Sequence, residues 1–437
     1  MRTPIDHRPG SAGAARATVR ADVAVIGGGV IGHGIAYEAQ RSGRSVALID
    51  DAPGNGASWA AAGMLAPVSE LHYQEEDLLE LMLEASSRWP GFAAGIAGAT
   101  ETDCGYLTTP TLAVGADAAD RRTLMDLRTV QQANGLAVEP LTVREARKRE
   151  PLLSPAIACA LDTPADHQVD PRRLVPALRL ALARAAFKTP DLAVAGAVEG
   201  YAVLDRATGL LWEGGTVAGA SLAGGGTVLA TETIVANGLQ AGTLGGLPAG
   251  LDLPLRPVHG DILRLAVPRH LQPLVTSTVR GLVHGVPVYI VPRQDGTVVI
   301  GATQREDALS DAVSAGGVYQ LLRDAQALVP AVAELELLEC TARARPGTPD
   351  NAPLLGRVPV NQTSPGEGSA ATGPGHVPGL IVATGFFRHG VLLTPAAAAI
   401  CTALLDGKAD PRWAPFRPER FSSPAAANQR THIKETA

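Results

Sequence analysis

The sequence predicts an α/β fold with a parallel sheet, and three observations near its N-terminal end support this. An apolar strand at 23–26 leads into a glycine-rich turn at 27–32, and a helix follows the turn. A second apolar strand at 46–49 ends in an acid, Asp50. A strand, helix and strand in this order place the two strands side by side and parallel.

Each glycine of the turn has a physical role. Gly27 permits the tight turn, Gly29 lets the backbone approach a pyrophosphate, and Gly32 lets the helix pack closely on the strand. The pyrophosphate is expected at the helix N-terminus near Val30, where free N–H groups and the helix dipole favour anions. Asp50 has the spacing at which a carboxylate accepts both ribose hydroxyls. The unit therefore predicts dinucleotide binding without a 2′-phosphate.

Composition limits the class of protein. A chain of 437 residues with 46% hydrophobic residues can form two domains, and a net charge of −6 without a basic stripe argues against nucleic acid. The four cysteines lie far apart without CxxC spacing, which fits free thiols in a reducing cytoplasm and suggests no metal site. The apolar run 391–405 is too short to span a membrane and is expected to be a buried helix.

Further periodicity and capping signals divide the chain. Helices are expected at 75–89, 121–150, 170–186 and 314–329, and a last one from Thr394 and Pro395 to Gly407. The segments 255–265, 286–292 and 297–303 alternate like strands of an antiparallel sheet. Apolar runs at 232–238 and 379–385 are expected to return to the first sheet, so the dinucleotide domain is discontinuous.

Five blocks point to one family. The segment 54–67 has small residues that would let a flat ligand approach, and it contains the first block, Ala-Ala-Ala-Gly-Met-Leu at 60–65. The others are Asp-His-Gln-Val-Asp-Pro at 166–171, Tyr-Ile-Val-Pro-Arg at 289–293, Arg-Pro-Gly-Thr-Pro-Asp at 345–350 and Gly-Phe-Phe-Arg-His-Gly at 385–390. Over about 21–415 the chain resembles the FAD-dependent oxidases of the D-amino-acid oxidase type, and is most similar to their glycine oxidases of thiamine biosynthesis.

The resemblance implies a domain plan. A discontinuous Rossmann-like FAD domain of the glutathione-reductase type is expected at 21–90, 157–247 and 338–415. An inserted α+β substrate domain with an antiparallel sheet is expected at 91–156 and 248–337. A disordered extension at 1–20 and a tail at 416–437 complete the chain.

The resemblance also implies site residues. FAD would be held by Gly27, Gly29, Val30, Ile31, Gly32, Asp50, Asp51, Ala57, Ser58, Ala62, Gly63, Met64, Val198, Phe386, Phe387, Arg388, His389, Gly390, Val391 and Leu392. The substrate carboxylate would be held by Arg345 and Arg388, with a hydrogen bond from Tyr289. A guanidinium suits this task because it grips a carboxylate through two parallel hydrogen bonds. From the residues alone, Arg345 fits a turn-stabilising arginine equally well, and Tyr289 fits a core position.

The activity implied is oxidative deamination of glycine and of small amines such as sarcosine, with reduction of O2 to H2O2. No His, Cys or Glu constellation offers a base and nucleophile pair, so the flavin would perform the chemistry. Thiazole synthase would be the metabolic partner, and the family suggests a homotetramer. Alternatives on the same fold are a D-amino-acid dehydrogenase and a sarcosine/proline-type oxidase. A flavin-binding protein without turnover would have no reason to retain both arginines and Tyr289.

Some positions depart from the family pattern. Arg343 lies just before the 345–350 block, Gln304 follows a Gly-Ala-Thr turn, and the stretch 236–240 lacks the usual aromatic residue. These changes are expected to affect the amine preference. Cys340 stands about three residues too early for the covalent flavin attachment of related sarcosine oxidases, so FAD is expected to bind non-covalently.

Overall fold

The computed structural model describes residues 18–71, 75–306, 311–360 and 375–422. Most of the expected extension 1–20 therefore lies outside the described residues, but Thr18 to Arg20 already belong to the first strand. Most of the tail 416–437 also lies outside them. Its first residues form short 3-10 turns in which Phe416 is buried.

The first sheet contains the dinucleotide unit. Its main path runs β17 (Leu354–Pro359), β18 (His376–Thr384), β11 (Thr227–Val235), β1 (Thr18–Ile26), β2 (Val46–Ile49) and β8 (Ala202–Val203). The strands from β18 to β8 are parallel, and β17 is antiparallel. The expected returns to this sheet are thus confirmed. Two further strands, β10 (Thr216–Leu222) and β9 (Ala207–Glu213), extend β11 as an antiparallel meander.

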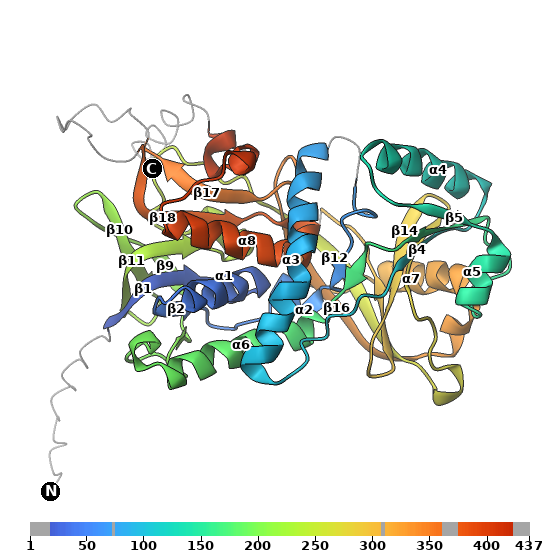
Figure 1. Cartoon of the computed structure of the whole chain (residues 1–437), viewed down its shortest axis with the longest axis horizontal. Helices are drawn as coiled ribbons and strands as arrows, with labels where there is room; N and C mark the ends of the chain where they lie inside the picture. Colours follow the sequence, from blue (N-terminus) through green and yellow to red (C-terminus); the bar gives the residue numbers. More distant parts are fainter. Residues whose placement is uncertain (1–17, 72–74, 307–310, 361–374, 423–437) are drawn as a thin grey trace, which may run out of the picture.

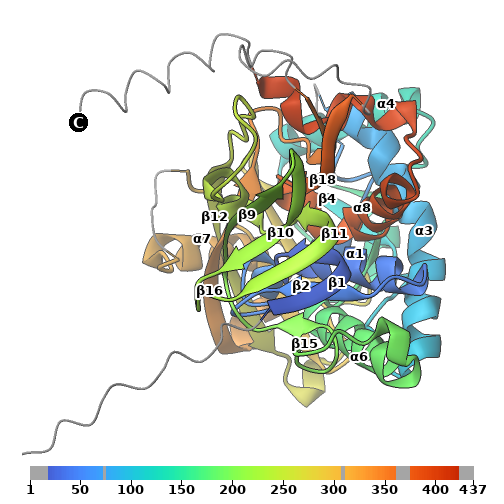
Figure 2. The same cartoon turned by 90° about the vertical axis from the view of Figure 1, so that its left-hand side faces the viewer.

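Helices cover one face of this sheet (Figures 1 and 2). They are α1 (Val30–Arg41), α3 (Glu76–Thr100), α6 (Pro171–Lys188) and α8 (Gly390–Leu405). Alternate residues of β1 show how the period of two works, because Val23 and Val25 face these helices while Ala24 and Ile26 face the opposite core. The parallel sheet is therefore buried on both faces, as its continuous apolar strands require.

The second sheet is mainly antiparallel and lies beside the first along the long axis of the molecule (Figure 1). Its order is β16 (Glu336–Gly347), β12 (Arg256–Ala266), β15 (Thr297–Gly301), β14 (Val286–Pro292), β13 (Thr278–Val283), β4 (Thr111–Gly115), β6 (Cys159–Thr163) and β5 (Glu139–Leu141). Helix α7 (Ala315–Leu328) packs Leu321 and Leu328 on one face. The other face turns towards the first sheet and packs Ile262 and Val299 against Ala60 and Ala62.

The remaining elements are helices, a small two-stranded sheet and short turns outside these layers. They are α2 (Ala57–Ala60), α4 (Ala118–Ala133), α5 (Val143–Arg149), the small sheet β3 (Met64–Leu65) with β7 (His167–Gln168), and the 3-10 turns η1 (Pro190–Leu192), η2 (Gly238–Thr243), η3 (Arg269–Leu271), η4 (Pro330–Glu334), η5 (Phe387–His389), η6 (Pro411–Phe416) and η7 (Pro418–Phe421).

Several expected boundaries differ from the observed ones. Helix α3 continues past Pro90 to Thr100 because its apolar stripe continues through Phe92 and Ile96, so the expected domain boundary at 90/91 falls inside a helix. The boundaries at 156/157 and 337/338 leave β6 and nearly all of β16 outside the expected substrate domain, although both belong to the second sheet. By sheet membership, we propose that both strands belong to the substrate domain.

Two helix expectations also need correction. The segment 121–150 is not one helix but α4 and α5 with β5 between them. Helix α8 begins at Gly390 rather than at Thr394, whose hydroxyl lies inside the helix and donates to the Gly390 carbonyl at 2.8 Å. By contrast, α6 has Asp170 as its N-cap and Pro171 in its first turn, as predicted.

One apolar helix in the described part of the chain is long enough to cross a membrane. It covers Phe387–Leu405, and 61% of its most apolar window is buried inside the protein. It packs against α1, and a side chain at Gly34 would overlap Thr394. This segment therefore has the burial of a core helix, in agreement with the expectation for 391–405.

The glycine turn depends on close backbone packing. Gly27 has a φ of +111°, and a Cβ there would lie 2.6 Å from the Ala236 carbonyl oxygen at the end of β11. A Cβ at Gly32 would overlap the Gly27 carbonyl. Only glycine at these two positions lets α1 start directly against the carboxyl ends of β1 and β11.

We predict that Gly32→Ala lowers the free energy of unfolding by about 1–3 kcal/mol, the usual cost of forcing an atom into a packed site. Retention of FAD on gel filtration should also fall. Gly91→Ala is the matched control because Gly91 is exposed within α3 and an added Cβ there meets no atom within 4 Å. That variant should gain about 0.5–1 kcal/mol. Equal stability of the two variants in denaturant melts would contradict the packing argument.

Candidate functional site

A cavity of about 880 Å³ lies between the two sheets. Its walls come from the glycine turn, the segment 50–64, the ends of β11 and β18, the start of α8, strands β12, β13, β14 and β16 of the second sheet, and the residues that follow β15. Ligand sites in open α/β sheets occur in this position, outside the carboxyl ends of the strands. The volume is in the range for small-molecule and cofactor sites.

The structure brings nearly all expected cofactor residues to this cavity. Those on its wall are Gly27, Gly29, Val30, Ile31, Asp50, Asp51, Ala57, Ser58, Ala62, Gly63, Met64, Phe386, Phe387, Arg388, His389, Gly390, Val391 and Leu392. A Cβ at Gly29 would meet no atom closer than Ser58 Oγ at 3.4 Å, so the backbone is open to a ligand there. Ser58 Oγ also accepts from the Val30 N–H at 2.9 Å and fixes the segment against the helix N-terminus.

Two expected residues lie elsewhere. Gly32 serves helix packing rather than the cavity wall. Val198 is 49% exposed, bridges Ala202 in a turn before β8, and does not line the cavity. The residue of β8 nearest the acid is instead Val203, whose carbonyl accepts from the Asp50 N–H at 3.1 Å.

Asp50 is held firmly at the cavity. One carboxylate oxygen accepts from the Gly28 N–H at 2.6 Å and the other from the Ala52 N–H at 2.7 Å. Each carboxylate oxygen has a second lone pair, so both can still accept from a ligand hydroxyl. The geometry fits the expected ribose contact.

The expected substrate residues come from the second sheet. Arg345 on β16 lies opposite Val258 of β12, and any side chain at Gly260 would overlap its guanidinium. Among the residues that the structure describes, no carboxylate lies within ion-pair distance of Arg345, and its one hydrogen bond, to the Thr303 carbonyl, is long at 3.5 Å. A guanidinium on a cavity wall without an anionic partner is suited to bind a carboxylate.

Tyr289 lies near this guanidinium on β14. Its cross-strand partner on β15 is Gly301, where any side chain would overlap the tyrosine ring. Burial raises the pKa of the Tyr289 hydroxyl, and the nearby Arg345 partly offsets this effect. The hydroxyl is therefore protonated near neutral pH and able to donate a hydrogen bond.

Arg388 reaches the cavity but is engaged by two carboxylates. Its Nε donates to Glu70 at 2.8 Å, and its Nη2 forms a short hydrogen bond with Glu75. Its Nη1 has no hydrogen-bond partner in the described part of the chain. Glu70 also forms a short ion pair with Arg280. Burial alone would raise the pKa of Glu70, but Arg280 and Arg388 outweigh it and hold the pKa far below its usual range.

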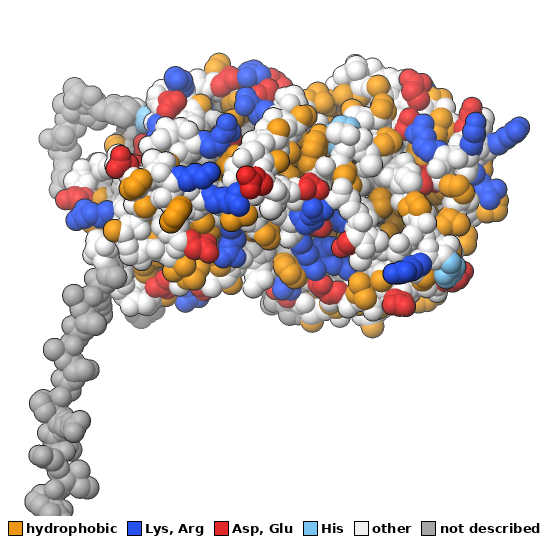
Figure 3. Space-filling view, turned by 60° about the horizontal axis from the view of Figure 1, so that its bottom comes forward, with side chains coloured by type: hydrophobic (Ala, Val, Ile, Leu, Met, Phe, Trp, Pro, Cys, Tyr) orange, Lys and Arg blue, Asp and Glu red, His pale blue; other side chains and the backbone are white. Residues whose placement is uncertain are grey.

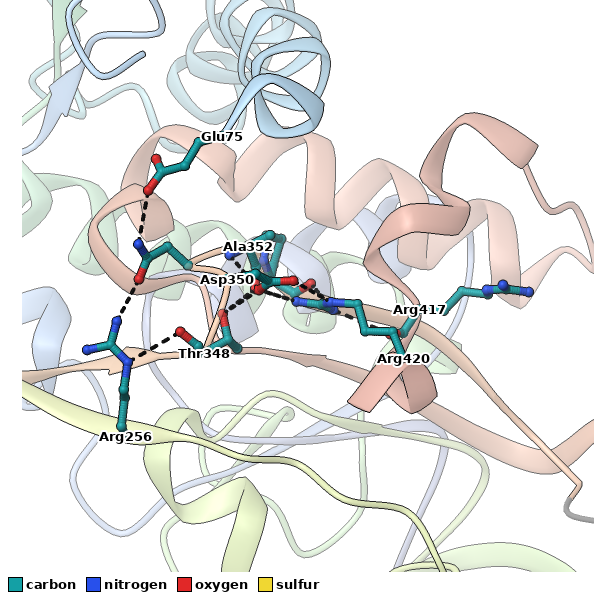
Figure 4. Close-up of polar contacts among 9 residues, drawn as sticks. Glu75, Arg256, Thr348, Asp350, Ala352, Arg417 and Arg420 are labelled. Atoms are coloured by element: carbon teal, nitrogen blue, oxygen red, sulfur yellow. Dashed lines mark hydrogen bonds and ion pairs between the residues drawn. The ribbon is translucent and has the colours of Figure 1, made fainter. Parts of the chain in front are cut away.

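The network continues away from the cavity (Figure 4). Glu75 accepts from Asn351 Nδ2 at 3.0 Å, and Asn351 Oδ1 accepts from Arg256 at 2.7 Å. Arg420 from the C-terminal part of the chain holds the neighbouring Asp350 through two hydrogen bonds at 2.8 Å. The C-terminal end of the 345–350 block is thereby fixed.

Asp166 holds the backbone that carries Glu70. It is fully buried, and its two oxygens accept from the N–H groups of Val68 and Ser69, each at 3.0 Å. Burial raises its pKa to about 6 even though these hydrogen bonds act in the opposite direction. The Asp-His-Gln-Val-Asp-Pro block thus has a structural role at the cavity.

The positions that depart from the family pattern also reach the cavity. Residues 236–240, Gln304 and Arg343 all lie on its wall. Arg343 Nε donates to the Asn55 carbonyl at 3.1 Å and so supports the segment 54–61. Basic side chains gather where the two halves of the molecule meet (Figure 3). Near this junction Arg172 stacks at 3.8 Å over the Trp59 ring and pairs with Glu339.

Sequence reasoning missed Glu70 and Arg280, which both line the cavity. Glu70 lies five residues after the 60–65 block, and this closeness could have marked it as a candidate site residue. Arg280 lies on a strand that matched no block. Its cross-strand pairing with Tyr289 becomes apparent only from the register of β13 and β14. Within the described residues, no group of three or more His, Cys, Asp or Glu side chains could hold a metal ion.

The fold and cavity define the class of dinucleotide-binding α/β proteins with a second, antiparallel sheet. The sequence model of the family described as FAD dependent oxidoreductase matches residues 22–404. The chain belongs to this family, and the open backbone at Gly29 and the helix N-terminus at Val30 fit its FAD.

Individual relatives agree with this assignment. The glycine oxidase of Geobacillus kaustophilus is 33% identical over 90% of this chain and 94% of the relative. Its crystal structure superposes with a TM-score of 0.76 at 31% identity, covering 92% of this chain and 99% of that one. The bifunctional protein ThiO/ThiG of Trichormus variabilis is 29% identical over 93% of this chain, which spans 56% of that longer protein.

We predict that Asp166→Asn changes how stability depends on pH. Because the pKa of Asp166 is raised from 3.8 to about 6 by burial, the native state binds more protons between these values. Its contribution therefore destabilises the fold progressively as pH rises from 4 to 6, by up to about 3 kcal/mol. Burial lowers the pKa of His33 to about 4 and gives the opposite slope, but that slope is common to both proteins.

The measurement is the difference in free energy of unfolding between the Asp166→Asn variant and the wild type from pH 4 to 7. As pH rises, the free energy of unfolding of the variant should increase relative to that of the wild type. This difference should become constant above pH 6. Parallel curves over the whole range would show that Asp166 titrates at its ordinary pKa.

Proposed function

We propose that the protein oxidises glycine with FAD, releasing the imine of glyoxylate and reducing O2 to H2O2. The observation that carries the proposal is the Arg345 guanidinium, which lies without a carboxylate partner among the described residues on the wall of the FAD cavity. Relatives named glycine oxidase that match almost the whole chain support the choice of glycine.

The side chains of this protein position the substrate. Bound FAD would supply the redox chemistry, which is acceptance of a hydride equivalent from the substrate Cα and transfer of the electrons to dioxygen. Arg345 binds the substrate carboxylate through two hydrogen bonds, and the Tyr289 hydroxyl donates a third. Arg388 adds its remaining Nη1 group. Fixing the carboxylate in this way orients the Cα–H bond, which is the main contribution of the protein.

The helix α8 supplies electrostatic support. Its first residues, Gly390 to Leu392, line the cavity, so its N–H groups and positive dipole end lie at the cavity wall and would contact FAD bound there. They would stabilise negative charge on FAD bound beside them by roughly 1 kcal/mol or more. The correction of the helix start from Thr394 to Gly390 brings this end one turn closer to the cavity.

The cavity supports non-covalent FAD and a small substrate. Cys340 on β16 packs with the core under α7 and is not on the cavity wall, so no thiol there is placed to attach a flavin. Tyr289, Met64 and Ile262 form part of one apolar cluster at the substrate end and limit the room for a side chain. The alternatives, a D-amino-acid dehydrogenase and a sarcosine/proline-type oxidase, would use the same carboxylate contacts.

We further propose a cytoplasmic homo-oligomer that supplies its imine product for the thiazole of thiamine. Thiazole synthase would be the enzyme acting next. The relatives named as bifunctional proteins, in which a region similar to this chain is part of a longer polypeptide, support a coupled second activity.

The proposed activity predicts that glycine reduces the bound flavin. Glycine added anaerobically to the purified holoprotein should bleach the oxidised flavin band, and air should restore it with release of H2O2. Sarcosine and D-proline are compared in the same way. Bleaching only by the larger substrates, or slow recovery in air, would instead support a D-amino-acid dehydrogenase or a sarcosine/proline-type oxidase. No bleaching by any amino acid would favour a flavin-binding protein without turnover.

The proposed carboxylate contact predicts the effect of changing Arg345. Arg345→Ala should lower kcat/KM for glycine at least about 100-fold, the scale of removing one partner of a buried charge pair, while FAD stays bound. Arg345→Lys should recover only a small part because an ammonium cannot make two parallel hydrogen bonds. The checks are steady-state kinetics and the flavin-to-protein absorbance ratio. Loss of FAD together with activity would assign Arg345 a structural role instead.

A further inference from the structure

The pair formed by Glu70 and Arg280 lies on the cavity wall but has no part in the chemistry above. Arg280 on β13 is the direct cross-strand partner of Tyr289 on β14, so both side chains leave the same face of the sheet. Glu70 lies between Arg280 and Arg388 and contacts both. A negative charge is thus built into the substrate end of the cavity.

The positive and negative side chains near Arg345 can be counted to find the net charge of this part of the cavity. Three guanidinium groups line this part of the cavity, those of Arg280, Arg345 and Arg388. The carboxylates of Glu70 and Glu75 pair with Arg280 and Arg388. One positive charge, that of Arg345, is left over. Arg343 and Asp311 are also on the wall, but they lie 4.0 Å apart and compensate each other.

The two carboxylates are fixed in place. Asp166 holds the backbone before Glu70 through the N–H groups of Val68 and Ser69. Asn351 Nδ2 donates to one carboxylate oxygen of Glu75, and Arg388 donates to the other. Because Glu70 is only 12% exposed and is kept ionised by its arginine partners, it cannot withdraw into solvent when a ligand enters.

We propose that Glu70 is a specificity-determining residue that makes the cavity accept monocarboxylate substrates and reject dicarboxylates. A substrate with one carboxylate neutralises the charge of Arg345. A second carboxylate would enter a low-dielectric site next to Glu70, where like charges repel strongly. The proposal rests on the proposed function and deepens it, because it defines the substrate class as α-amino acids without an acidic side chain.

The test uses two ligands that differ in charge but hardly in shape. Malonate carries two carboxylates, and malonamate has a neutral amide in place of one. Each is titrated into the holoenzyme, and the dissociation constant is read from the change in flavin absorption. The wild type should bind malonamate more tightly than malonate. In Glu70→Gln the preference should move towards malonate by at least about tenfold, since like-charge contacts cost several kcal/mol.

Two further variants keep the test decisive if Glu70→Gln alone does not retain FAD. Arg280→Gln removes a positive charge and should shift the preference further towards malonamate. The double variant Glu70→Gln/Arg280→Gln removes both charges and should return to the wild-type ratio. A purely steric effect of position 70 would not be reversed by the change at Arg280.

Glu232→Gln is the matched control. Glu232 forms a doubly hydrogen-bonded pair with Arg357 at 2.7 and 3.0 Å and is 20% exposed, but it lies on β11 away from the cavity wall. Breaking this pair tests for a general effect of lost ion pairs, and the malonate-to-malonamate ratio should stay as in the wild type.

The outcomes separate this inference from the proposed function. An unchanged ratio in the Glu70 and Arg280 variants, or no binding of malonate by Glu70→Gln, overturns the role of Glu70 even if glycine is oxidised. If glycine does not bleach the flavin, the proposed function fails, whatever the ratio shows.

Discussion

The close approach of three backbone segments at the glycine turn is the constraint on which the site depends. Gly27 lies against the end of β11 at Ala236, and Gly32 lies against the carbonyl of Gly27. Because of these contacts, α1 begins at the edge of the parallel sheet where β1, β2, β11 and β18 all end. The cavity, the segment 50–64 and the start of α8 are arranged around this point. A longer side chain here would displace the helix N-terminus on which the pyrophosphate is expected to bind.

The electrostatics of the cavity follow from burial. A buried guanidinium without a partner is costly, so proteins pair such groups or leave them for a ligand. Arg280 and Arg388 are paired by Glu70 and Glu75, whereas Arg345 has no such partner among the described residues. Among the described residues of the cavity wall, Arg345 is therefore the arginine whose charge no carboxylate balances. This pattern, more than the number of arginines, supports the proposal that Arg345 binds the substrate carboxylate.

The sequence was sufficient for features that depend on local patterns. The strand, turn and helix at 23–41, the N-cap Asp170 and the antiparallel strands at 255–303 all follow from short-range periodicity and turn chemistry, and the structure confirms them. It was insufficient where distant segments decide the outcome. The stripe that carries α3 past Pro90 is stabilised by packing against α8, and β16 joins the second sheet through a register with β12 that no local signal reveals.

The same reasoning explains the limits of the site assignment. Arg388 was recognised through its block, but its partners Glu70 and Glu75 lie more than 300 residues earlier in the chain. Ion pairs between such distant segments contribute little net stability, because desolvation offsets most of the attraction. These ion pairs do restrict how the segments can pack together, since an alternative packing would leave a charge buried and unpaired. These ion pairs join four segments of the chain. Arg280 lies on β13, Glu70 follows β3, Arg388 lies in η5, and Glu75 lies at the start of α3. The substrate end of the cavity therefore takes its form only when both sheets are folded against each other.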